Sequence, residues 1–71
     1  METDWQARVK GLLKSELKRR NVTYVQLVEK LAAIGVYDTE PNIRTKISRG
    51  GFTAVFFVQC LEAIGVKEIH L

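Results

Sequence analysis

The chain has 71 residues, of which 46% are hydrophobic and 27% charged, and its formal net charge is +3 at pH 7. These values exclude a disordered chain and indicate one globular domain spanning residues 1–71. Residues 1–20 carry a net charge of +3, and residues 41–53 carry +3 without any acid. This distribution indicates an anionic partner.

No stretch has the length and apolarity of a membrane span or the pattern of a signal peptide, so we expect a cytoplasmic protein without a membrane partner. The single cysteine, Cys60, lacks an internal disulfide partner and lies in an apolar run. Two interpretations stay open for it. A buried thiol in a reducing compartment is the favoured one, and a reactive or intermolecular thiol is the other.

The first predicted helix covers residues 4–20. Thr3 and Gln6 have the spacing of a capping box, in which each side chain satisfies a free backbone N–H of the helix start. Asn21 suits the left-handed conformation that ends a helix. Apolar residues recur at helical spacing and predict one buried stripe: Trp5, Val9, Leu12, Leu13 and Leu17.

Two further helices are expected at residues 24–34 and 40–49. Thr23 and Gln26 repeat the capping box, and Gly35 ends the second helix. Thr39 or Asp38 caps the third helix, where Pro41 fits the first turn because its missing N–H is no loss there. The large apolar residues of this helix are Ile43 and Ile47, so we expect most of its surface to be exposed.

A fourth helix is predicted at residues 54–64, beginning after Thr53. Its expected core face consists of Ala54, Phe57, Val58, Leu61 and Ile64. Val55, Phe56, Cys60 and Ala63 lie outside that stripe, so the helix is either central or shared with a partner. In the tail, residues 66–71, β-branched residues allow a brief β-strand. A homodimer is therefore a hypothesis, with these candidate contacts: Val55, Phe56, Ile69 and Leu71.

These elements define an all-α, compact four-helix domain with a short extended tail. The second and third helices, joined by a short connection containing Gly35, have the order of a helix-turn-helix, whose second helix enters the DNA major groove. Arginine can pair with guanine and asparagine with adenine, while hydroxyls and lysine suit bases or phosphates. The candidate DNA contacts on the third helix are Asn42, Arg44, Thr45, Lys46, Ser48 and Arg49.

Three lysines of the first helix share one face at a spacing of four residues: Lys10, Lys14 and Lys18. Such a row can follow the phosphates of a DNA backbone, and it would make the affinity fall with salt. A solvated helix face would have the same pattern, and taken alone the lysines favour that interpretation. We therefore treat them as candidate phosphate contacts that depend on the third helix.

Several short runs resemble the lambda-repressor-like helix-turn-helix domains of the Cro/CI or XRE type. They are residues 17–23 (LKRRNVT), 27–31 (LVEKL), 47–50 (ISRG) and 61–66 (LEAIGV). Residues 42–52 (NIRTKISRGGF) look still more similar to a small bacterial domain family of unknown function. The resemblance implies the same helical fold, double-stranded DNA as partner and contacts at Thr45, Lys46 and Arg49. The chain differs from the Cro/CI type by a longer connection after Gly35 and by Ser48 in place of a glutamate.

Catalysis is not expected. The sequence offers one histidine, His70, and one cysteine, and it contains no metal-ligand spacing, nucleophile–base set or phosphate-binding glycine loop. We expect no cofactor, metal or small-molecule substrate. The main alternative to DNA binding is a protein-interaction module on the same fold, because fold alone does not determine function. The surplus apolar surface at Val55, Phe56 and the tail supports that alternative.

Overall fold

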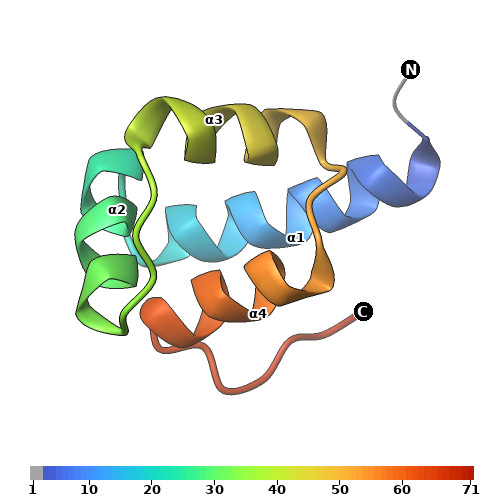
Figure 1. The fold of residues 1–71 in the computed structure, drawn as a ribbon. Coiled ribbons are helices and arrows are strands. Elements are labelled where there is room, and N and C mark those ends of the chain that lie inside the picture. Colours follow the sequence, from blue (N-terminus) through green and yellow to red (C-terminus); the bar gives the residue numbers. More distant parts are fainter. Residues whose placement is uncertain (1–2) are drawn as a thin grey trace.

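The computed structural model describes residues 3–71. In chain order the helices are α1 (Asp4–Arg19), α2 (Tyr24–Ala33), α3 (Glu40–Arg49) and α4 (Ala54–Ala63), followed by an extended tail. Helix α2 stands across one end of α1, and α3 and α4 lie along α1 (Figure 1). The all-α architecture is thus the predicted one, and each helix boundary lies within one residue of its expected position.

Threonine caps begin all these helices. In α1, the Thr3 hydroxyl accepts the Gln6 N–H at 3.1 Å while the Gln6 side chain accepts the Thr3 N–H at 2.7 Å. Thr23 and Gln26 form the same reciprocal pair at the start of α2. Both predicted capping boxes are confirmed, and at the end of α1 Asn21 adopts the predicted left-handed conformation with a φ of 55°.

One core joins the helices. Its fully buried side chains come from every helix: Leu13, Leu27, Leu31, Ile43, Ile47 and Cys60. Leu17, Phe56, Ile64 and Val66 complete the buried cluster. Helix α3 contributes only two of these ten side chains, Ile43 and Ile47. Its packing on the core therefore depends on a narrow apolar stripe.

The predicted core face of α4 is only partly right, since Ile64 is buried and Phe57 and Leu61 pack on the core, but the most buried side chains of the helix were not predicted. Phe56 and Cys60 point inward, with Phe56 only 6% exposed, whereas Val58 lies on the surface. The helix is apolar around most of its circumference, so periodicity alone does not fix which side is buried. The ring of Phe52 lies 5.6 Å from the ring of Phe56 in an edge-to-face contact that helps hold it inside. A dimer contact through Phe56 is therefore contradicted.

The tail and the start of α1 also differ from expectation. Among residues 3–71 there is no β-strand. Instead, Val66 is buried, Ile69 packs on the core, and the Arg8 guanidinium donates to the main-chain oxygen of Leu71 at 2.6 Å. A strand needs a neighbouring strand for its backbone groups, and the described chain supplies none. Trp5, expected in the buried stripe, is 74% exposed because the first turn of α1 extends past the other helices (Figure 1).

Within the described part of the chain, no helix is both long enough and apolar enough to cross a membrane.

Candidate nucleic-acid interface

Helix α3 is anchored inward by two side chains only. Ile43 and Ile47 are fully buried, and all the remaining side chains from Pro41 to Arg49 are exposed. All six residues predicted as DNA contacts therefore lie on the surface: Asn42, Arg44, Thr45, Lys46, Ser48 and Arg49. The prediction of an exposed polar face on this helix is confirmed.

The end of α3 is fixed against α1. Gly50 caps the helix with a φ of 69°, and a Cβ atom at this position would lie 2.6 Å from the backbone oxygen of Gln6. The Lys10 ammonium donates to the main-chain oxygen of Ser48 at 3.2 Å. These contacts hold the first lysine of the α1 row beside the exposed face of α3.

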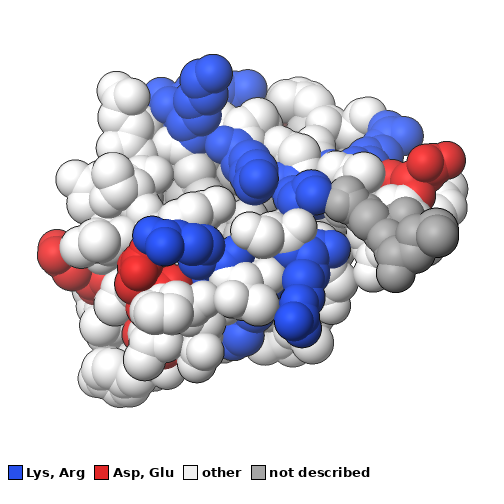
Figure 2. All heavy atoms as spheres, turned by 90° about the horizontal axis from the view of Figure 1, so that it is seen from above, with Lys and Arg blue, Asp and Glu red and all other residues white. Residues whose placement is uncertain are grey.

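The next two lysines of the row meet the start of α3. Lys14, Lys18 and Arg44 line one hollow of about 400 Å³. Its lining also includes Leu17, Val22, Glu40 and the start of α2. The Arg44 guanidinium lies 5.9 Å from the centre of the Tyr24 ring, a cation–π distance. Viewed from above α3, Lys and Arg atoms run in a band across this face (Figure 2). Asp and Glu atoms lie toward its two ends and also directly beside one of the basic side chains (Figure 2). The two basic segments of the sequence thus form one basic surface, made of α1 and α3.

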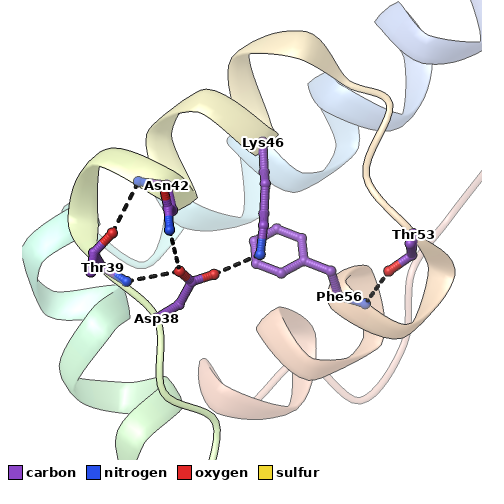
Figure 3. Close-up of polar contacts among 6 residues, drawn as sticks. All are labelled: Asp38, Thr39, Asn42, Lys46, Thr53 and Phe56. Atoms are coloured by element: carbon purple, nitrogen blue, oxygen red, sulfur yellow. Dashed lines mark hydrogen bonds and ion pairs between the residues drawn. The ribbon is translucent and has the colours of Figure 1, made fainter.

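Two acids of the chain occupy part of this surface. The Asp38 carboxylate accepts from the Lys46 ammonium at 2.6 Å and from the Asn42 amide at 3.2 Å (Figure 3). Glu40 forms an ion pair with Arg44, four residues later on the same helix. The hydrogen bond from Lys46 is the largest of several effects that lower the pKa of Asp38, so this carboxylate is ionised at neutral pH.

Lys46 is additionally held by an aromatic ring. Its ammonium lies 4.9 Å from the centre of the Phe56 ring, which belongs to α4 (Figure 3). The side chain therefore bridges the connection before α3 and the helix that follows it. Lys46 was predicted as a DNA contact, and sequence reasoning missed its two partners.

The last turns of α3 are more open. Thr45 and Arg49 line a shallow hollow of about 280 Å³ together with Gln6 and Phe52. Within residues 3–71, the Arg49 guanidinium forms no ion pair, and no hydrogen bond of the Thr45 or Ser48 hydroxyl is found. No sequence pattern indicates Gln6 as a neighbour of this group, because 39 or more positions separate it from Thr45 and Arg49.

Six residues, 34–39, join α2 to α3. A helix-turn-helix uses about three or four. The connection is ordered, since the Val36 N–H donates to the Leu31 oxygen at 2.9 Å and Val36 packs on the core. The longer connection predicted from the sequence is present, and Asp38 lies within it.

The thiol and the metal-ligating side chains of the described residues are not arranged for thiol chemistry or for metal binding. Burial raises the pKa of the Cys60 thiol to about 12, so the thiol stays protonated at neutral pH. This observation favours the interpretation of Cys60 as a buried structural thiol. Within residues 3–71 no group of three or more His, Cys, Asp or Glu side chains is arranged to hold a metal ion.

Fold and surface together define a small all-α domain with one basic face. A model of the family described as a domain of unknown function, DUF6471, matches residues 5–69, so the chain belongs to this family. No curated protein and no solved structure matches the chain significantly. The predicted resemblance to a small domain family of unknown function is therefore confirmed at that level.

Proposed function

We propose that this protein binds double-stranded DNA, with α3 in the major groove and the lysine row of α1 on the phosphate backbone. The observation that supports the proposal is the alignment of two separate basic segments along one face. Lys14 and Lys18 of α1 share a hollow with Arg44 of α3, and Lys10 contacts the end of α3. A protein that only needed a soluble surface would not require this convergence.

The exposed chemistry of α3 suits base recognition. Arg49 carries a planar donor pair that matches guanine, and the Thr45 and Ser48 hydroxyls can bond to bases or phosphates. Because Ile43 and Ile47 are its only buried side chains, α3 projects from the core and its outer side is accessible. We infer a small bacterial transcriptional regulator of the lambda-repressor-like helix-turn-helix class. It acts in the cytoplasm, without a cofactor and without catalysis.

The proposal gives a definite salt dependence. If Lys10, Lys14, Lys18 and Arg49 each neutralise one phosphate, log K falls with log salt at a slope of about −4. The affinity then drops roughly 100-fold between about 50 and about 200 mM salt.

Fluorescence anisotropy with random and genomic duplexes at these two salt concentrations tests the proposal. Arg49→Ala should weaken binding, whereas Lys67→Ala in the tail removes the same charge away from α3 and should change it little. Uniform weakening across sequences indicates a phosphate contact, and loss at a preferred site only indicates base recognition. Salt-insensitive binding, or none at micromolar protein, contradicts the proposal.

The alternative function is a protein-interaction module, and one observation favours it. An apolar groove of about 310 Å³ lies between α1, the start of α4 and the tail, and its lining includes Val9, Leu12, Phe57 and Leu71. A homodimer contact through the exposed Val55 and Leu71 is one form of this alternative. Sedimentation at high micromolar concentration tests that form, since a mass of 8.1 kDa would show a monomer.

A further inference from the structure

The polar side chains of α3 fall into two groups that differ in their partners. Asn42, Arg44 and Lys46 are each bonded to an acid from residues 38–40. For Thr45, Ser48 and Arg49, no side-chain hydrogen bond or ion pair is found within residues 3–71. The first group must exchange a partner before it can contact an external anion, whereas the second group need not.

Of the two acids, Asp38 and Glu40, Asp38 has more hydrogen-bond partners and the less exposed side chain. One of its oxygens accepts from the Thr39 N–H at 2.8 Å and from the Asn42 amide, and the other accepts from the Lys46 ammonium. Its side chain is 14% exposed, against 45% for that of Lys46. Because Asp38 belongs to the same ordered connection as Val36, its carboxylate is held close to Lys46 and has a high effective concentration there.

We propose that Asp38 limits the DNA affinity of this protein by occupying Lys46 and Asn42 with its own carboxylate in place of a DNA phosphate or an adenine edge. The proposal rests on the proposed function, and it identifies Asp38 as a residue that tunes the DNA-binding surface without touching DNA. A phosphate that approaches Lys46 must displace a carboxylate of the same charge. The exchange therefore adds little net affinity, and the phosphates near Lys46 contribute less than those near Arg49.

Two measurable consequences follow. Lys46→Ala should leave the salt slope nearly unchanged, because Lys46 is already neutralised by Asp38 and releases no counterion from DNA. It should lower the affinity to some extent, because it leaves the Asp38 carboxylate without its partner. Asp38→Asn releases the ammonium but keeps an acceptor for the Thr39 N–H. It should make the slope more negative by about 0.9 and raise the affinity about 5-fold at about 0.15 M salt, the contribution of one added phosphate contact.

The test is a double-mutant cycle by fluorescence anisotropy over a range of salt concentrations. It uses the wild type, Asp38→Asn, Lys46→Ala and the double variant. Glu62→Gln on α4 is the matched control, since it removes one negative charge from an exposed position outside α3. We expect the steeper salt slope of Asp38→Asn to disappear in the Lys46→Ala background and to be absent from Glu62→Gln.

Circular dichroism at 222 nm establishes that each variant is folded. If Asp38→Asn does not fold, Lys46→Ala still decides, since a loss of salt slope equal to that of Arg49→Ala would overturn the proposal. A steeper slope that persists without Lys46, or an equal change of slope in Glu62→Gln, would overturn it as well. In these cases the wild type still binds DNA and the proposed function stands, whereas absence of salt-sensitive binding by the wild type refutes both.

Discussion

At Gly50 the end of α3 approaches the backbone of α1 closely. Its φ of 69° lies in the left-handed region, and an added Cβ would lie 2.6 Å from the Gln6 oxygen and 3.2 Å from the Lys10 Cβ. Gly35 provides a matched control, because its φ of 84° is also left-handed but an added Cβ there meets nothing within 4 Å. Alanine at either position therefore incurs backbone strain, and only Gly50→Ala adds a collision.

The magnitudes separate the two variants. Left-handed backbone costs a non-glycine residue about 1–2 kcal/mol. The collision at Gly50 is with a backbone oxygen, which cannot rotate away as a side chain can, and overpacking of this kind costs about 1–3 kcal/mol. Gly50→Ala should thus lose about 2–5 kcal/mol from a free energy of unfolding of about 4–11 kcal/mol for a chain of this length.

Thermal and urea unfolding followed by circular dichroism at 222 nm measure the difference. Each kcal/mol lowers the Tm of a domain of this size by about 4–8 °C, so Gly50→Ala should lower it about twice as far as Gly35→Ala. Equal losses for both variants would refute the close approach of α3 to the start of α1.

Three further predictions concern the core and the loop. Ile47→Ala should cost about 2–5 kcal/mol in urea unfolding and Ile47→Val only about 0.5–1.5 kcal/mol, since Ile47 is fully buried, and equal small losses would contradict its role as an anchor. The Cys60 thiol, protonated and buried, should react with a thiol reagent in urea and not in buffer at neutral pH, whereas rapid labelling of the folded protein would indicate a reactive thiol. Because the folded-state pKa of Asp38 is lowered, its contribution to stability is present above its unfolded pKa and is lost as pH falls through the folded one. Between about pH 5 and about pH 2, stability should fall more steeply in the wild type than in Asp38→Asn, and parallel curves would count against the Lys46 contact.

The helices could be predicted because their signals are local. A capping box needs only two residues three positions apart, and Thr3–Gln6 and Thr23–Gln26 both form as the spacing indicates. The two isoleucines of α3 were sufficient to orient it, since the helix has no competing apolar side. Where only one helix start or one buried side is compatible with the local residues, the sequence is sufficient to predict it.

The predictions failed where several sides of a helix were equally suited to burial, or where the contact joins residues far apart in the sequence. Helix α4 is apolar on nearly every side, so the burial of Phe56 depends on how α4 packs rather than on its own pattern. The Glu40–Arg44 pair has the spacing of neighbours on a helix and could have been found from the sequence. The Asp38–Lys46 pair spans a connection and a helix, and no periodicity relates positions eight apart across such a boundary.

The most direct test of the DNA-binding surface is an NMR titration of the labelled protein with a duplex, following every backbone amide. Binding through α3 and the lysine row predicts the largest shifts at Thr45 and Arg49, with smaller ones near Lys14 and Lys18. Shifts confined to the apolar groove around Val9 and Phe57, or none at all, would contradict DNA binding by this face.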